Sequence, residues 1–564
     1  MKILKSNKWI INFGLCVAAA GLLVSCDDYL DENPDNRAVI DTEEEIISLL
    51  GSAYPEAGIS VMSELMSDNT DDMSGDPRFL KYDERFYDQV FYWKEVTETD
   101  NDGPSLTWEN GYKAAATANQ ALQSIEELGG ATTTKLKEAK GEALLCRAYA
   151  HFWLACMFCQ AYDSKNAASD LGLPYATKPE TTLYSENIER GTMAELYAKI
   201  DKDIQEALPL IGDTHYQQPK FHFNTQAALA FAARFYLFYE KWDLAVKYAT
   251  QCLGSNPKSL LRDWDEQESF GITNDMDPRS QAYVKSSAKC NFMLTPTYSM
   301  AGFWFSNYGW VSRFSHNSFI SNKETLDCKN DFWDLKNMRC PSLQFIGGNI
   351  DKVLVAKLPA MFEMTDVVSQ TGYYHSVEIP FKADNLLLER AEAYIMLKQY
   401  DKALADLNIW MENYVKKSTP LTLEKIKNYY TRLQYYSITL PTQRRHLNPR
   451  FEIDAEGSDQ ECLLQCLLNF KRLENIHEGM RWQDIKRYGI EICRRMIDSD
   501  ANLIVLSYDS YMGSDSPYLA VRDPRCAMQV PFKVIAAGFQ PNPRGQEAEA
   551  KGMTVKIDRL VSVK

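Results

Sequence analysis

Two distant segments of the chain carry the same pattern of small and aromatic residues. In each segment a small residue, an aromatic residue, a second aromatic residue and a second small residue follow one another at offsets of three, six and three positions. The residues are Ala233, Tyr236, Trp242 and Ala245 in the first segment and Ala391, Tyr394, Tyr400 and Ala403 in the second. An offset of three puts both members of a pair on one face of a helix. The pattern therefore predicts two pairs of antiparallel helices, in which the alanines allow close approach and the rings fill the space beside them.

This pattern resembles a tetratricopeptide repeat, in which pairs of helices stack on one another. Asn256-Pro257 follows the first copy, where that repeat usually places its terminal proline. The two copies start 158 residues apart, so we do not expect a simple tandem array. The alternative is that two amphipathic helical hairpins share the pattern by coincidence.

Helical periodicity also covers much of the chain before the first repeat. Residues 111–128 and 135–160 have small and apolar residues at helical spacing, with Gly129-Gly130 between them, and predict an antiparallel hairpin. Thr192 is the expected N-cap of a further helix that runs to Leu210.

The segment between the two repeats differs in composition. Residues 255–380 lose helical periodicity and are rich in Asn, Ser, Gly, Pro and aromatic residues, and 417–460 are similarly mixed. Long irregular segments in a helical protein usually carry function. The predicted fold is therefore mainly α, with tetratricopeptide-like hairpins at about 108–254 and 384–416 as scaffold. Its second half would be loop-rich, with short strands and the ligand-binding insertions.

The N-terminus has the features of a bacterial lipoprotein signal. A positively charged start is followed by an apolar stretch that is short for a membrane-spanning helix. The stretch ends in Leu23-Val24-Ser25-Cys26, which resembles a lipobox, the motif in which the cysteine sulfur receives diacylglycerol. We predict a signal peptide at 1–25, lipidation of Cys26, an acidic tether at 26–40 and one domain at 41–564. The alternative is an uncleaved anchor helix.

The charge, the cysteines and the absent motifs exclude some classes of protein. The formal net charge is −16, so phosphate backbones would be repelled and no nucleic-acid partner is expected. The 13 cysteines lack the spacing of a disulfide framework, and no pairing follows from them. The sequence has no Gly-x-Ser-x-Gly, His-Glu-x-x-His or phosphate-binding glycine motif, so no enzymatic activity is expected.

Several longer motifs follow one another along the chain. They are Trp108-x-x-x-Tyr112, Gly141-Glu142-Ala143-x-x-x-Arg147-Ala148-Tyr149, Leu173-Pro174-Tyr175 and the run His-Glu-Gly-Met-Arg-Trp-Gln-Asp-Ile-Lys-Arg-Tyr-Gly from His477 to Gly489. In this order, after a lipobox and an acidic tether, they resemble the SusD/RagB family of outer-membrane nutrient-uptake lipoproteins. The C-terminal end departs from the family pattern, because Asn542-Pro543 is followed by Arg544.

The resemblance implies a function as well as a SusD-like fold. A member of this family would bind oligosaccharides, or in some cases peptides, and deliver them to a SusC-like TonB-dependent barrel transporter. Its lipid anchor would hold it on the cell outer membrane, facing the exterior, and it would not be an enzyme. Two alternatives stay open: a non-catalytic tetratricopeptide scaffold for envelope assembly, and a surface glycan hydrolase, whose two carboxylates an acidic sequence does not exclude.

The most specific family motif also has a structural interpretation. Arg481, Trp482, Asp484 and Arg487 share one helical segment. Charged pairs at helical spacing usually brace a helix or face solvent. We expect these residues to hold the repeat helices against the C-terminal segment rather than to contact ligand.

Aromatic residues concentrate in 298–319, where eight occur in 22 residues. Rings stack on the flat apolar faces of sugars, and neighbouring polar side chains bond the sugar hydroxyl groups. The predicted ligand-binding residues are Trp304, Asn307, Tyr308, Trp310, Arg313 and Phe314. The alternative is a buried strand that packs these rings into the scaffold. Weaker candidates are Tyr82, Phe86, Tyr87 and Trp93 in residues 79–93, where near alternation favours the core, and the pair Tyr373-Tyr374.

One segment has the spacing of a calcium loop. Glu98, Asp100, Asp102 and Glu109 occupy the oxygen-ligand positions one, three, five and twelve, and Gly103 occupies position six. This spacing raises the hypothesis of a bound Ca²⁺, with no other cofactor expected. The alternative is a polar loop that caps the helix beginning near Trp108.

Overall fold

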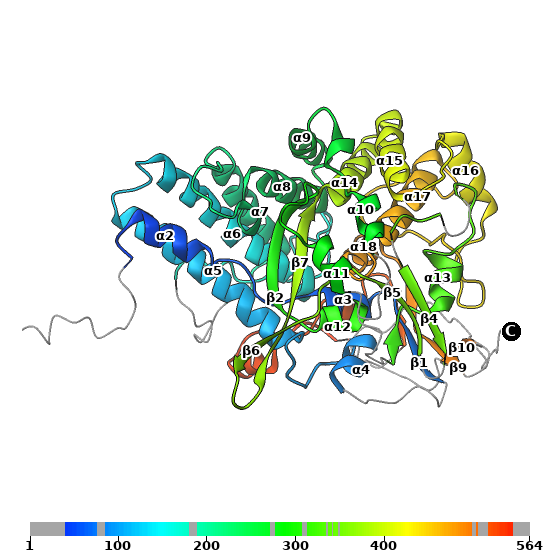
Figure 1. Cartoon of the computed structure of the whole chain (residues 1–564), viewed down its shortest axis with the longest axis horizontal. Coiled ribbons are helices and arrows are strands. Elements are labelled where there is room, and N and C mark those ends of the chain that lie inside the picture. Colours follow the sequence, from blue (N-terminus) through cyan, green and yellow to red (C-terminus); the bar gives the residue numbers. More distant parts are fainter. Residues whose placement is uncertain are drawn as a thin grey trace, which may run out of the picture. The chain divides into compact units, whose positions relative to one another are not determined.

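The structure is a computed structural model of the chain (Figure 1). It describes residues 40–75, 85–179, 189–270, 277–306, 313–333, 337–340, 342–347, 350–498, 503–505 and 517–544. The chain divides into two units, Met1–Thr42 and Glu43–Lys564. The predicted signal peptide, Cys26 and nearly all of the tether lie outside the described residues. Among the described helices, none combines the length and the apolar character needed to cross a membrane.

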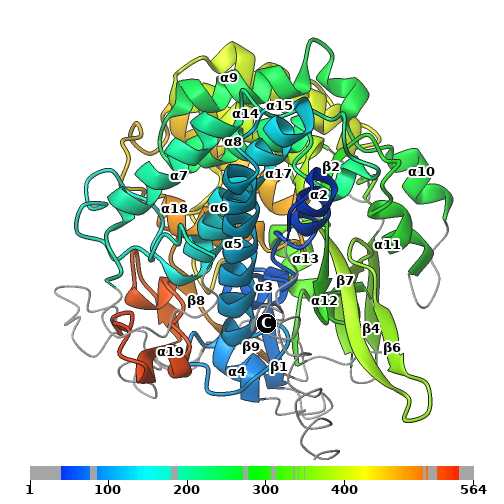
Figure 2. The ribbon, with the colours of Figure 1, turned by 90° about the vertical axis from the view of Figure 1, so that its left-hand side faces the viewer.

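The first helical layer contains long helices from the N-terminal half. They are α2 (Glu43–Leu50), α5 (Pro104–Glu127), α6 (Thr134–Phe158) and α7 (Met193–Ala207), and Figure 2 views this layer face on. The helices expected at 111–128 and 135–160 are thus confirmed, and α5 begins earlier than expected because Pro104 suits the first turn of a helix. Thr192 caps α7 through a capping box with Glu195, as its sequence position indicated.

The two repeat segments form the expected helical hairpins. The first consists of α8 (Thr225–Phe238) and α9 (Trp242–Leu253), and the second of α14 (Ala383–Met396) and α15 (Tyr400–Tyr414). Although they are far apart in sequence, α14 packs against both α8 and α9. All four signature alanines are buried, which agrees with their predicted role in close helix packing.

The turns of the two hairpins also share one geometry. Glu240 and Lys398 occupy matching positions and have φ values of 60° and 57°. In the residue that follows, the backbone N–H of Lys241 donates to the Tyr236 carbonyl at 2.9 Å, and that of Gln399 donates to the Tyr394 carbonyl at 2.8 Å. The two hairpins therefore share the geometry of their turns as well as the spacing of their small and aromatic residues.

The segment between the repeats contains strands and short helices, as its composition predicted. The strands β2 (Asn291–Tyr298), β6 (Met361–Asp366) and β7 (Thr371–Lys382) form an antiparallel sheet in the order β2-β7-β6. A separate hairpin pairs β4 (Ser342–Gly347) with β5 (Ile350–Val355). The short helices here are α10 (Trp264–Ser269), α11 (Asp277–Tyr283), α12 (Ala301–Ser306) and α13 (Ser318–Glu324), with the 3-10 turns η1 (Pro219–Phe221) and η2 (Pro257–Leu260) before them.

Segments from both ends of the chain meet in a second sheet. Its order is β10-β9-β1-β3, formed by Leu503–Val505, Arg495–Asp498, Asp71–Gly75 and Phe314–Ser315. The remaining elements are α3 (Ser60–Met66), α4 (Arg85–Phe91), α16 (Leu423–Arg432), α17 (Asp459–Glu474), α18 (Met480–Tyr488), the strand pair β8 (Ile492–Cys493) and β11 (Tyr518–Leu519), η5 (Pro524–Cys526) and α19 (Phe532–Ala536).

A buried network of charged side chains joins these segments, and we call it the ionic core. Its members are Asp68, Asp71, Glu324, Glu392, Arg445, Lys471, Arg472, Arg481, Asp484, Arg487 and Arg495, all of them buried. The Arg481 guanidinium donates to both Asp68 oxygens, at 2.8 and 2.9 Å, and Arg487 pairs with Glu392 at 2.7 Å. The expected contact with the repeat helices is confirmed for Arg487, because Glu392 belongs to α14. Arg481 instead ties α18 to the segment between α3 and β1.

Electrostatics explain how so many charges stay buried. Burial alone would raise the pKa of a carboxyl group, but Arg487 and Lys471 overcome that effect at Glu392 and hold its pKa at about 2. Arg495, Arg445 and Arg472 have the same consequence for Glu324, whose pKa is also about 2. Each charge is thus matched by opposite charges from other segments, so the network fixes how α17, α18, β1 and β9 lie together.

Candidate functional site

Two of the three predicted ligand-binding residues that the structure describes, Trp304 and Phe314, lie inside the molecule. The Trp304 side chain is 4% exposed and packs with its ring centre 4.2 Å from that of Tyr87. The Phe314 ring, also 4% exposed, stacks on Phe91 at 4.4 Å. Phe314 lies on β3, the edge strand beside β1, and is covered by Phe91 of α4 and by Tyr92. Neither ring offers a face to a sugar, so the alternative of a core role applies to both.

Arg313 also serves the scaffold. Its guanidinium donates to both carboxylate oxygens of Asp72, at 2.8 and 2.6 Å, and to Asp88 at 3.1 Å. These contacts engage three of the guanidinium N–H groups that could otherwise donate hydrogen bonds to a ligand. Arg313 thus links α4 and β1 to the start of β3, and its contact with a ligand stays a prediction. Asn307, Tyr308 and Trp310 lie outside the described residues.

Two other rings of the same segment contact the hairpin formed by β6 and β7. The Phe303 ring of α12 meets Tyr374 edge-on, with 4.6 Å between centres. The Tyr298 ring at the end of β2 lies 5.8 Å from Tyr373 and 4.5 Å from the imidazole of His375. The ring-rich segment therefore divides: part of it packs into the core, and part of it contacts a surface hairpin.

The register of the hairpin gives it two ring-bearing faces. Phe362 is opposite Tyr374, and Glu363 is opposite Tyr373. Because neighbouring residues of a strand point to opposite faces, Phe362 and Tyr374 share one face, and Glu363 and Tyr373 share the other. Phe362 is 45% exposed and Tyr373 is 52% exposed. We call the set Tyr298, Phe303, Phe362, Tyr373 and Tyr374 the aromatic surface.

Polar groups accompany these rings. The Nε2 atom of His375 lies 2.8 Å from Glu363 Oε2, on the face that carries Tyr373. The tyrosines add hydroxyl groups that both donate and accept hydrogen bonds. Next to this face, Tyr298 is tied to the N-terminal segment, since its backbone N–H donates to the Glu56 carbonyl at 2.7 Å. The arrangement combines exposed ring faces with hydrogen-bonding groups on a strand frame.

The sequence indicated only part of the aromatic surface. Tyr373 and Tyr374 were expected to be weak candidates, and Phe362, Glu363 and His375 were not singled out. A signal was present, because two segments of strand-forming residues flank the polar turn Ser369-Gln370. Sequence alone did not show which strand faces stay uncovered, since that depends on the elements packed beside them.

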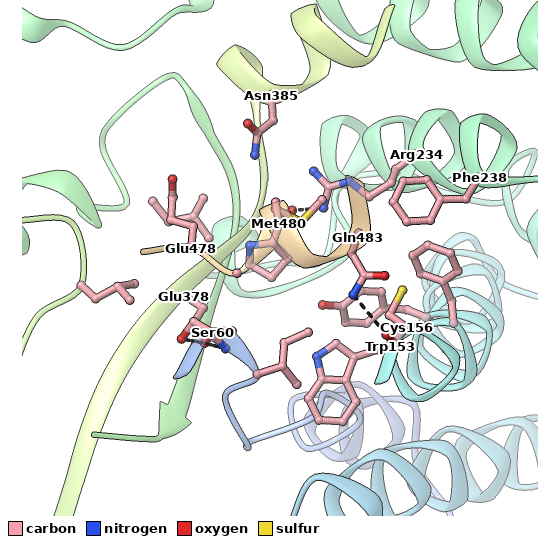
Figure 3. Close-up of a pocket in the computed structure, with 17 residues that line it drawn as sticks. Ser60, Trp153, Cys156, Arg234, Phe238, Glu378, Asn385, Glu478, Met480 and Gln483 are labelled. Atoms are coloured by element: carbon pink, nitrogen blue, oxygen red, sulfur yellow. Dashed lines mark hydrogen bonds between the residues drawn. The ribbon is translucent and has the colours of Figure 1, made fainter. Parts of the chain in front are cut away.

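A cavity in the interior is too small for a sugar (Figure 3). It has a volume of about 80 Å³ and lies among α3, α6, α8, β7 and α18. Ser60 Oγ donates to Glu378 at 2.7 Å and Gln483 Nε2 donates to the Cys156 carbonyl at 3.1 Å. Burial raises the pKa of Glu378. A space of this size accommodates a few water molecules beside its polar groups.

A larger groove lies along η2, α10, α11 and α15. Its volume is about 590 Å³, and its lining is dominated by charged residues of both signs. Lys258 and Glu412 pair across it at 3.0 Å. The one aromatic residue in its lining, Trp264, is 3% exposed. The groove therefore provides no ring face for stacking, in contrast to the aromatic surface.

The four carboxylates of the calcium hypothesis do not converge. Asp102 is buried and accepts hydrogen bonds from Ser299 Oγ at 2.5 Å and from the Met300 N–H at 2.8 Å. Glu98 instead pairs with Arg85 at 3.1 Å, and Glu109 lies exposed on α5. Among the residues with described positions, no group of three or more His, Cys, Asp or Glu side chains is arranged to hold a metal ion.

Asp102 instead joins two elements. Its contacts with Ser299 and Met300 tie the start of α5 to the end of β2, next to the aromatic surface. Burial raises the pKa of Asp102 to about 7. The expected loop that caps a helix near Trp108 is corrected as well, because α5 begins at Pro104 and its N-cap residue Gly103 provides no side chain.

Comparison with known proteins identifies relatives of this architecture. Residues 28–237 match the family model SusD-like, described as starch-binding and associating with the outer membrane. A SusD superfamily protein from Bacteroides thetaiotaomicron has a TM-score of 0.62 at 19% identity, covering 89% of this chain and 100% of that one. A SusD-like carbohydrate binding protein from Bacteroides vulgatus has a TM-score of 0.59 at 15% identity, covering 88% and 96%.

A further solved structure is described as a laminarin binding SusD-like protein. Its TM-score is 0.50 at 14% identity, and the match covers 88% of this chain and 97% of that one. No curated protein matches the sequence. At these identities the solved structures show a common fold, which extends over the described parts of both halves of the chain.

Proposed function

We propose that the chain is a SusD-like protein, which the match of residues 28–237 and the shared fold support, and that it binds oligosaccharides on the aromatic surface. The observation that carries this proposal is the exposure of rings on both faces of the hairpin, Phe362 on one face and Tyr373 on the other. A ring held on a strand loses little conformational freedom when a sugar stacks on it. The family's starch-binding description and the laminarin-binding neighbour support a carbohydrate as the ligand.

The two kinds of group on this surface would divide the work of binding. Ring faces would cover the apolar C–H faces of the sugar, and Glu363, His375 and the tyrosine hydroxyls would bond its hydroxyl groups. We extend the proposal to Asn307, Tyr308 and Trp310, which follow α12 directly in sequence. In this mechanism the ligand is held and released without a chemical step.

We further propose that the bound oligosaccharide passes to a SusC-like TonB-dependent transporter in the outer membrane. Lipidation of Cys26 would anchor the protein there, and two or more acyl chains give stable attachment to a bilayer. The family's association with the outer membrane supports this location. Labelling with a radioactive fatty acid, in wild type and in Cys26→Ala, tests the anchor directly.

A binding screen tests the ligand and the site together. The mature protein is titrated with starch, laminarin and other purified polysaccharides, and with a set of peptides, by calorimetry. We expect saturable binding of a glycan and at least a tenfold loss of affinity in the double variant Phe362→Ala/Tyr373→Ala. Leu440→Ala, at a residue 43% exposed outside this surface, is the control and should bind normally.

Different outcomes contradict different parts of the proposal. Selective binding of peptides would show that the ligand class is wrong. If the double variant binds glycan normally but Trp310→Ala does not, the binding site is in the segment after α12 rather than on the hairpin. Release of shortened sugars during prolonged incubation would show catalysis and contradict the non-enzymatic function.

A further inference from the structure

The tip of the β6–β7 hairpin carries exposed apolar residues beyond the aromatic surface. Met364 is 47% exposed, Val367 is 78% exposed and Val368 is 96% exposed. Of nine large apolar side chains exposed in the described part of the chain, five belong to this one hairpin. In Figures 1 and 2 the turn between β6 and β7 extends beyond the neighbouring elements. Apolar side chains gathered in this way usually mark an interaction site.

The backbone of β6 offers a second feature for docking. β6 is the last strand of the order β2-β7-β6, so within the described residues no strand pairs with its outer edge. The opposite edge differs, because β2 packs against η1 and α8. A free edge is a row of unpaired donors and acceptors, which proteins usually protect with charged residues, especially lysine, or with proline. β6 has no lysine or proline, and its only charged residues are the acidic Glu363 and Asp366.

The charge of the hairpin restricts what can cover it. Residues 361–375 contain Glu363 and Asp366 but no lysine or arginine. If a second copy of the chain paired with this edge, its Glu363 and Asp366 would lie close to the same residues of the first copy and repel them. The net charge of −16 on each chain adds to the repulsion between the copies. An anionic lipid surface would be repelled for the same reason, since attraction to such surfaces needs basic residues. The complementary surface is a protein segment with basic residues.

We propose that the free edge of β6, together with Met364, Val367 and Val368, docks an extended segment of a partner protein that is apolar in its middle and carries Lys or Arg at its ends. Main-chain hydrogen bonds would add the segment to the sheet as a further strand. Its apolar residues would cover the exposed tip, and its basic residues would meet Glu363 and Asp366. The proposal does not depend on the identity of the glycan.

Synthetic peptides test this proposal on the full mature protein. The probe is Lys-Arg-Val-Thr-Val-Thr-Val-Arg-Lys with a fluorescent label, and binding is followed by anisotropy. We expect at least about tenfold weaker binding when its basic residues are replaced by glutamate, and a similar loss when the central valine is replaced by proline. Hydrogen exchange should slow at the amides of Met361–Asp366 when the basic peptide is present.

Protein variants locate the contact. The triple variant Met364→Lys/Val367→Lys/Val368→Lys should lose at least about tenfold in affinity for the basic peptide. Phe532→Lys introduces the same change at a residue that is 74% exposed on α19 and should bind as wild type. None of these residues belongs to the aromatic surface, so glycan binding should stay unchanged in both variants.

Several results would overturn the proposal. Equal binding of the proline peptide would exclude strand addition, and protection at other amides would place the contact elsewhere. Sedimentation that shows a dimer in wild type and a monomer in the triple variant would identify a second copy as the occupant. Flotation of wild type, but not of the triple variant, with vesicles of phosphatidylglycerol would identify a lipid surface. Absence of binding by the basic peptide would also reject it.

Discussion

The ionic core and the β6–β7 hairpin reverse the usual distribution of residue types. In the ionic core, charged side chains such as Asp68 and Arg481 are almost wholly buried, whereas on the hairpin Phe362 and Tyr373 are about half exposed. The core is stabilised because every charge has partners from other segments. The hairpin keeps its rings uncovered because no described element lies over their outer faces.

The ionic core and the hairpin thus have different roles: the ionic core holds the fold together, and the hairpin carries the residues proposed to bind ligand. A buried charge without its partner is costly, so the ionic core permits only one arrangement of the segments that meet there. An exposed ring is nearly neutral for folding and remains available for a ligand. The residues around Arg481 that carry the resemblance to the SusD/RagB family therefore belong to the frame, and the residues proposed to bind belong to a region with little sequence signature.

Low pH should have the largest effect on stability, because it breaks the ion pairs of the ionic core and leaves the contacts of the hairpin intact. In the ionic core the pKa values of Glu324 and Glu392 are held at about 2, below the ordinary value for glutamate, and Glu478, which Lys357 and Lys382 pair with, is held at the same value. A carboxyl whose pKa is lower in the folded state adds stability above its ordinary pKa and loses it as pH falls towards 2. We expect unfolding by circular dichroism between about pH 4.5 and 2. An unchanged thermal midpoint across that range would contradict the role of these pairs.

Removal of a single charge from the ionic core should have the next largest effect. Asp68→Asn leaves Arg481, Arg472 and Arg445 without their shared carboxylate. We expect a loss of about 3 to 5 kcal/mol in the free energy of unfolding, measured with urea. The control is Glu412→Gln, which breaks a pair exposed to solvent and should cost less than about 1 kcal/mol. Equal losses in the two variants would show that burial of the network is unimportant.

Trp304→Ala tests the boundary between the two regions. Because the ring is buried against Tyr87, its removal should cost about 3 kcal/mol of stability through the cavity it leaves. The affinity of the folded protein for its glycan should stay the same. If Trp304→Ala is as stable as wild type but no longer binds glycan, Trp304 belongs to the binding site after all.

Tyr373→Ala should have the smallest effect on folding and the clearest effect on binding. The side chain is 52% exposed, so we expect a change in the free energy of unfolding below about 1 kcal/mol. Loss of one stacking ring should weaken glycan binding about tenfold, which calorimetry would measure. Tyr373→Phe retains the ring and should recover most of the affinity. If it does not, the hydroxyl group rather than the ring face is the binding element.

The helical frame was largely predictable from sequence, while the candidate site was predictable only in part. The spacing of Ala233 and Tyr236, and of Ala391 and Tyr394, is a local property that a helix converts directly into a packing face. The rings of the segment around Trp304 share composition and spacing, yet the structure buries Trp304 and leaves Phe303 in contact with the hairpin. The composition of the segment does not show which ring is buried in the core and which contacts the hairpin.

The sequence by itself determined several of the helices, the cap at Thr192 and the repeated hairpin, because each depends on residues close together in the chain. Its motifs also carried the resemblance to the SusD/RagB family. Only the tertiary structure decided that Arg481 meets Asp68, and that Phe303 covers part of the face shared by Phe362 and Tyr374. Both facts depend on which distant segments pack against each other. Exposure and charge pairing are properties of the assembled fold, so no local pattern encodes them.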